Sequence, residues 1–65
     1  MTKVREILNG LDVLEETKII RHNGEYVVVA TGQLKGFTKS IYTYFKNSKV
    51  AKEVQKRLNY LKDIK

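Results

Sequence analysis

Residues 18–31, with the sequence KIIRHNGEYVVVAT, decide the fold. Asn23-Gly24 separates two segments, residues 18–22 and 25–31, that are rich in β-branched and aromatic side chains. A type I′ turn needs positive φ at both of its central residues, and Asn-Gly meets that need. The stretch therefore predicts a tight antiparallel hairpin.

A second turn, Lys35-Gly36, leads into a third predicted strand over residues 37–45. This segment is rich in good strand formers: Ile41, Tyr42, Thr43, Tyr44 and Phe45. The sequence thus predicts a three-stranded meander with the valine-rich strand in the middle. If both turns contain two residues, Val28 lies opposite Ile19 and Thr43, and every other pair follows from that register.

Apolar residues near the N-terminus recur at the spacing of an amphipathic helix. They are Val4, Ile7, Leu8, Leu11 and Leu14. Gly10 interrupts this pattern, because glycine costs about 1 kcal/mol in a helix interior relative to alanine. The helix either tolerates Gly10 or ends there and continues as a turn that carries Leu11 to Leu14.

A second helix is predicted near the C-terminus, where Asn47 and Ser48 are both good N-caps. Its apolar stripe consists of Val50, Val54, Leu58 and Leu61, with Ala51 beside it. Glu53 can pair with Arg57 one turn later. Residues 1–65 are therefore predicted to form a single α+β domain of order α-β-β-β-α, a three-stranded antiparallel meander with the helices packed on one face.

The alternation of side chains along the strands divides the sheet into two faces. We expect the helices on the face that holds Ile19, Tyr26, Val28, Ala30, Ile41 and Phe45. The other face is expected to expose an apolar patch beside Lys18, made of Ile20, Val27, Val29, Tyr42 and Tyr44. A bulge at Gly32 would exchange the faces along part of the third strand.

Three interpretations of this second face stay open. It could be the interface of a homodimer or another protein contact. It could be a nucleic-acid platform on which Tyr42 and Tyr44 stack. The helices could also pack on different faces and bury it.

The composition excludes several functions. The chain has no cysteine and a single histidine, His22, so the usual nucleophile and base constellations cannot be assembled, and we expect no enzyme, no cofactor and no metal. The longest apolar run, residues 26–30, is far shorter than the roughly 20 residues of a membrane span. The N-terminus has no signal-peptide pattern. We expect a cytoplasmic protein without a membrane partner.

The formal net charge of +6 is unevenly spread along the chain. Residues 1–31 carry four Lys/Arg and five Asp/Glu, whereas residues 32–65 carry nine and two, a net of +7. A one-sided positive field attracts polyanions, so we expect a small nucleic-acid-binding or nucleic-acid-associated regulatory domain. The expected phosphate contacts are Lys35, Lys39, Lys46, Lys49, Lys52 and Lys56. The alternatives are a solubilising surface and a protein-protein interaction module or homodimer that uses the second sheet face.

The segment Tyr44-Phe45-Lys46-Asn47-Ser48-Lys49-Val50-Ala51-Lys52 carries two resemblances. With the preceding strands, residues 25–62 resemble the arm-site DNA-binding domains of phage and transposon integrases. That resemblance implies a protein of phage or mobile-element type whose sheet lies in the DNA major groove. The order α-β-β-β-α is similar to that of double-stranded RNA-binding domains, which implies phosphate contacts by lysines at the start of the last helix.

Overall fold

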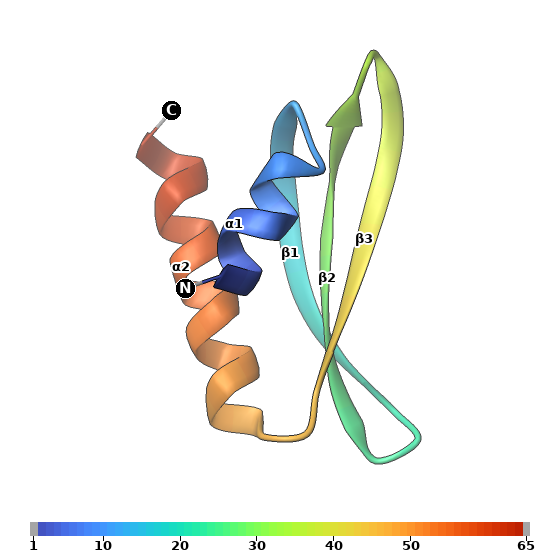
Figure 1. The fold of residues 1–65 in the computed structure, drawn as a ribbon, viewed down its shortest axis with the longest axis vertical. Helices are drawn as coiled ribbons and strands as arrows, with labels where there is room; N and C mark the ends of the chain where they lie inside the picture. Colours follow the sequence, from blue (N-terminus) through green and yellow to red (C-terminus); the bar gives the residue numbers. More distant parts are fainter. Residues whose placement is uncertain (1, 65) are drawn as a thin grey trace.

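A computed structural model describes residues 2–64 (Figure 1). The chain forms helix α1 (Thr2–Asn9), strands β1 (Val13–His22), β2 (Glu25–Leu34) and β3 (Phe37–Phe45), and helix α2 (Ser48–Ile64). The strands form one sheet of order β1-β2-β3. Both helices lie on the same side of this sheet (Figure 1). The predicted α+β class and the α-β-β-β-α order are confirmed, and the interpretation with helices on different faces is wrong.

Both hairpin turns have the predicted backbone. In the first turn, Asn23 and Gly24 have φ of 51° and 79°. In the second, Lys35 and Gly36 have φ of 53° and 84°. Positive φ at both central residues matches the right-handed twist of the flanking strands, as a type I′ turn requires. The turns fix the register as predicted, with Val28 opposite Ile19 and Thr43.

The chain after α1 differs from the prediction. The helix ends at Asn9, and Gly10 donates its N–H to the carbonyl oxygens of Glu6 and Ile7. Leu14 is buried, but it lies in strand β1, which begins at Val13 rather than at Lys18. The apolar spacing continues from helix into strand because both elements cover the same core.

The sheet contains one irregularity, and it lies in β1 rather than at Gly32 of β2. The β1–β2 register shifts between Leu14 and Glu16, so Glu15 is the extra residue of a bulge. Leu14 pairs with Gly32, and a Cβ on Gly32 would lie 1.8 Å from the carbonyl oxygen of Val13. Gly32 thus lets the bulged strand pass close to β2. The β2–β3 register runs without a shift, so no residue of β3 changes face.

The main core lies between the helices and the sheet. Its buried residues are Val4, Ile7, Leu11, Leu14, Val28, Ala30, Ala51, Val54 and Leu58. The expected stripe of α2 is confirmed except at Val50, which is exposed because the helix turns Ala51 toward the sheet instead. The Thr17 hydroxyl donates to Oδ1 of Asn59 over 2.7 Å and ties α2 to β1.

The second face of the sheet carries no helix, but its exposure is smaller than expected. Val27 and Val29 are only 1% and 2% exposed, so their prediction as surface residues is wrong. Val27 lies between Ile20 and Tyr44 in the pairing, and Val29 lies between Lys18 and Tyr42. The large side chains of the edge strands therefore cover the small ones of the central strand.

Candidate nucleic-acid interface

Helix α2 begins with a side-chain cap. Oδ1 of Asn47 accepts the N–H of Lys49 over 2.8 Å, and the carbonyl oxygen of Asn47 accepts the N–H of Ala51. This satisfies one of the N–H groups that a helix leaves free at its start. Asn47, rather than Ser48, is the N-cap, and it fixes where the helix begins and thus which side chains face outward.

The outward face of α2 carries three lysines, Lys49, Lys52 and Lys56, at positions i, i+3 and i+7. Such spacing places them on one side of the helix, over about 10 Å of its length. All three are exposed, and the opposite side of the helix presents Ala51, Val54 and Leu58 to the core. The lysines therefore point away from the sheet.

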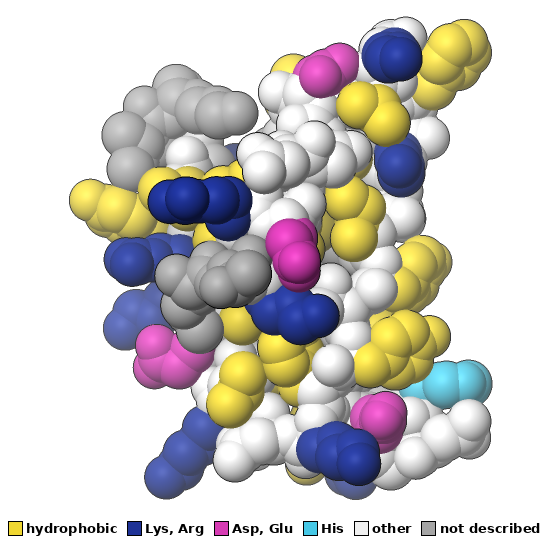
Figure 2. Space-filling model, in the orientation of Figure 1, with side chains coloured by type: hydrophobic (Ala, Val, Ile, Leu, Met, Phe, Trp, Pro, Cys, Tyr) yellow, Lys and Arg dark blue, Asp and Glu magenta, His cyan; other side chains and the backbone are white. Residues whose placement is uncertain are grey.

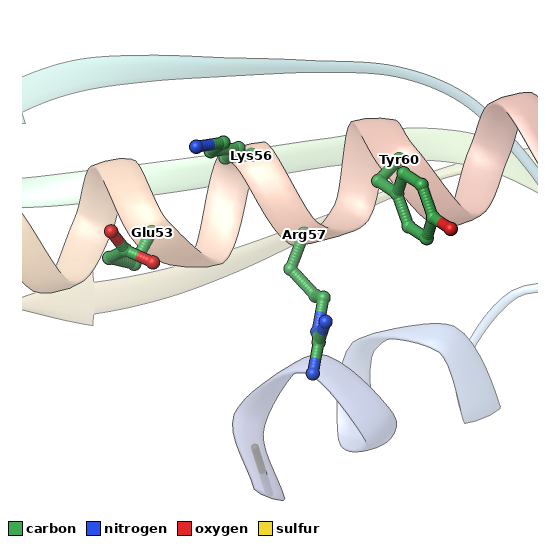
Figure 3. A pocket seen from close by; sticks show the side chains of 4 residues that line it. All are labelled: Glu53, Lys56, Arg57 and Tyr60. Carbon is green, nitrogen blue, oxygen red and sulfur yellow. The ribbon is translucent and has the colours of Figure 1, made fainter.

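A shallow groove runs beside this stripe, lined by Glu53, Lys56, Arg57 and Tyr60 (Figure 3). Arg57 extends from α2 toward α1, and Tyr60 presents its ring beside the helix (Figure 3). Among the described residues, the single ion pair joins Lys3 and Glu6, so the expected pairing of Glu53 with Arg57 is absent. Within the part of the chain that the structure describes, no carboxylate forms an ion pair with the cations of this surface, although Glu53 lies among them.

In the folded protein the helix layer and the sheet layer differ in net charge. Residues 10–45, which form the sheet and its turns, carry four Lys/Arg and four Asp/Glu, a net of zero. The helices with the turn before α2, residues 2–9 and 46–64, carry eight Lys/Arg and three Asp/Glu, a net of +5. In Figure 2, Lys and Arg side chains gather along the α2 side, while hydrophobic side chains recur along the sheet on the opposite side. The positive field thus belongs to the helix layer.

The structure does not bring the six predicted lysines together. Lys46, Lys49, Lys52 and Lys56 follow one another from the β3–α2 turn along α2, whereas Lys35 and Lys39 lie at the β2–β3 turn and in β3. Strand β3 separates the two groups by about 25 Å, at roughly 3.3 Å per residue. The N–H of Lys35 also donates to Oδ2 of Asp12 over 2.7 Å, which places a carboxylate beside that turn.

Two residues of this surface were missed by sequence reasoning. The sequence pattern predicts Arg57 as the partner of Glu53 and gives no role to Tyr60, although Tyr60 lies one helical turn after Lys56 on the same polar face. A helical projection of residues 48–64 contains this signal. The candidate surface is therefore the α2 basic face, defined as Lys49, Lys52, Lys56, Arg57 and Tyr60, with Glu53 inside it.

Tyr42 and Tyr44 lie elsewhere, on the uncovered side of the sheet. The ring of His22 lies 6.5 Å from that of Tyr44 in an edge-to-face arrangement, so aromatic side chains do gather there. Because α2 covers the other side, its lysines and these tyrosines point in opposite directions. The two features do not form one continuous surface.

No family model matches this chain, and searches of curated proteins and of solved structures give no significant match. The resemblances to integrase arm-site domains and double-stranded RNA-binding domains stay predictions. Within residues 2–64, no helix is long and apolar enough to cross a membrane.

Proposed function

We propose that this chain binds nucleic acid through the α2 basic face, by contacts to phosphates that do not depend on base sequence. The observation that supports the proposal is the separation of charge: the helix layer has a net charge of +5 and the sheet segment has none. A duplex carries one negative charge per about 1.7 Å of its axis, so the 10 Å stripe of lysines meets several phosphates at once.

The chemistry of the surface suits a phosphate backbone better than a base edge. Lysine is a flexible point charge that accommodates many phosphate positions, and α2 offers no Asn or Gln in the exposed stripe to recognise a base. Tyr60 adds a ring on which an unpaired base can stack. Single-stranded nucleic acid can therefore use both the lysines and Tyr60, whereas a duplex uses only the cations.

The number of contacts predicts how affinity depends on salt. Four phosphate contacts, by Lys49, Lys52, Lys56 and Arg57, would give a slope of log K against log salt of about −2.8 for a single strand to about −3.6 for a duplex. Between 50 and 200 mM salt, affinity should fall by about 50- to 150-fold. A fluorescence anisotropy titration of labelled single-stranded and duplex oligonucleotides at these two concentrations measures both quantities.

Two triple variants that lose the same charge test where on the protein nucleic acid binds. Lys49→Gln, Lys52→Gln and Lys56→Gln together should weaken binding by at least tenfold and reduce the steepness of the salt dependence by about 2 to 3. The matched control, Lys18→Gln, Lys35→Gln and Lys39→Gln, removes three charges from the sheet segment and should leave both values near wild type. Equal losses in the two variants would contradict the α2 basic face, and no binding at 50 mM salt would contradict the function.

A further inference from the structure

The uncovered face of the sheet offers a second, chemically different surface. Its apolar centre consists of Ile20, Tyr42 and Tyr44, all exposed, above the buried side chains of Val27 and Val29. The side chains of the edge strands cover Val27 and Val29 of the central strand, and a hollow lined in part by Tyr42 and Tyr44 lies along β3. The uncovered face of a sheet can pack on another sheet at about 10 Å, with side chains interdigitated.

We propose that this face binds the same face of a second copy of the chain, forming a homodimer with the helices on the outside. The inference is independent of nucleic-acid binding, which uses the opposite side. Isologous contacts of this type are the commonest arrangement in soluble oligomers.

The distribution of charge favours a second copy of the chain as the partner of the uncovered face. Two copies that approached through their helices would bring two net charges of +5 together, whereas the uncovered face carries Glu16, Lys18 and Glu25, a net of only −1. The uncovered face also carries both signs, since Glu16 and Lys18 lie two residues apart on β1 and point to the same side. In a twofold interface each residue of such a pair can meet its opposite on the other copy. A polyanion would instead find Glu16 and Glu25 beside the tyrosines.

The available area places this interface among the smaller ones. The longest extent of the molecule is 33 Å, and three strands spaced about 4.8 Å apart give a footprint of about 500 Å² per copy. The total of about 1,000 Å² lies at the lower limit of specific interfaces, below the roughly 1,600 Å² of standard ones. We therefore expect a concentration-dependent dimer with a Kd in the micromolar range.

Sedimentation equilibrium between about 1 μM and 1 mM protein tests the inference, because this range spans the expected Kd. The wild type should change from a monomer of 7.6 kDa to a dimer of twice that mass. The variant Tyr42→Ser/Tyr44→Ser should raise the Kd at least tenfold. Tyr60→Ser is the matched control, because Tyr60 is 62% exposed against 56% and 53% for Tyr42 and Tyr44, but lies on α2. It should dimerise like the wild type.

A charge variant keeps the test decisive if the double tyrosine variant does not fold. Lys18→Glu changes the net charge of this face from −1 to −3 and should weaken the dimer, whereas its control Lys56→Glu lowers the charge of the helix layer and should not. A wild type that stays monomeric at 1 mM would overturn the inference. A dimer that is weakened by Tyr60→Ser but not by Lys18→Glu would also overturn it. So would a monomer in which a bound oligonucleotide covers Tyr42 and Tyr44.

Discussion

Replacing Gly32 by alanine tests the most demanding feature of the fold, the close passage of β1 over β2. The added Cβ would lie 1.8 Å from the carbonyl oxygen and 2.9 Å from the carbonyl carbon of Val13. Both atoms belong to the backbone, so no side-chain rotation relieves the contact, and β1 must move by about 1 Å or more to restore ordinary non-bonded distances. That movement strains the pairs of Val13 and Leu14 with β2 and the 2.7 Å bond from the N–H of Asp12 to the carbonyl of Gln33.

The expected loss follows from these contacts. Two weakened backbone hydrogen bonds contribute about 1 kcal/mol each, and partial exposure of Leu14 contributes about another 1 kcal/mol. We expect Gly32→Ala to lower the free energy of unfolding by about 2–4 kcal/mol, a large share of the roughly 3–10 kcal/mol typical for this length. The melting temperature should fall by about 10–25 °C.

Urea and thermal unfolding followed by far-UV circular dichroism measure this loss. The matched control is Gly10→Ala, whose Cβ would lie 2.7 Å from the Cδ1 atom of Ile41 and at ordinary contact distance, 3.5 and 3.6 Å, from the carbonyl oxygens of Ile7 and Glu6. That methyl group belongs to a side chain and can rotate, so the control should change stability by about 1 kcal/mol or less. If Gly32→Ala unfolds within about 0.5 kcal/mol of the wild type, the bulge does not bring the two backbones together as described.

Four further substitutions address the core, the helix anchors and the basic face. Leu58→Ala, at a fully buried position, should cost about 2–5 kcal/mol in urea unfolding; a loss under 1 kcal/mol would mean that α2 is not packed on the sheet. Thr17→Val removes the donor to Asn59 and should cost about 1 kcal/mol by the same assay, with no cost expected if the bond is absent. Asn47→Ala removes the N-cap and should lower the melting temperature by an amount equivalent to about 1 kcal/mol, whereas an unchanged value would place the cap elsewhere. Glu53→Gln should strengthen oligonucleotide binding several-fold in anisotropy titrations, because it removes a repulsive carboxylate; an equal gain in Glu16→Gln would show that only net charge matters.

The fold could be predicted from the sequence wherever local rules decide it. Asn23-Gly24 and Lys35-Gly36 determine two turns of fixed length, and fixed turns determine the register and faces of all three strands. The start of β1 at Val13 and its bulge could not be predicted. The spacing of Leu11 and Leu14 fits a turn as well as a strand. Only the contact between Val13 and Gly32, two residues far apart in the sequence, selects the strand.

Burial on the uncovered face also depends on three-dimensional neighbours. Val27 and Val29 were placed on the correct side of the sheet, but their low exposure results from the size of the side chains paired with them on β1 and β3. A single strand considered alone does not contain that information.

The candidate site was predicted in part. The lysines of α2 follow from helical spacing, but the sequence divides the charge at residue 31, whereas the structure divides it between the sheet and the helices. Lys35 and Lys39 are therefore separate from the α2 basic face. The positive charge is concentrated in the helix layer of the folded protein, not in the C-terminal half of the sequence as such. Folding also places the Asp12 carboxylate at the second turn, where Oδ2 accepts the N–H of Lys35.

Chemical-shift mapping by NMR shows directly where on the protein an oligonucleotide binds. Backbone amide shifts of ¹⁵N-labelled protein are followed while a short single-stranded oligonucleotide is added at low salt. We expect the largest shift changes at residues of the α2 basic face (Lys49, Lys52, Lys56, Arg57 and Tyr60), and we expect these changes to shrink as salt is added. Largest changes at Lys18, Tyr42 and Tyr44, with α2 unaffected, would contradict binding through the α2 basic face.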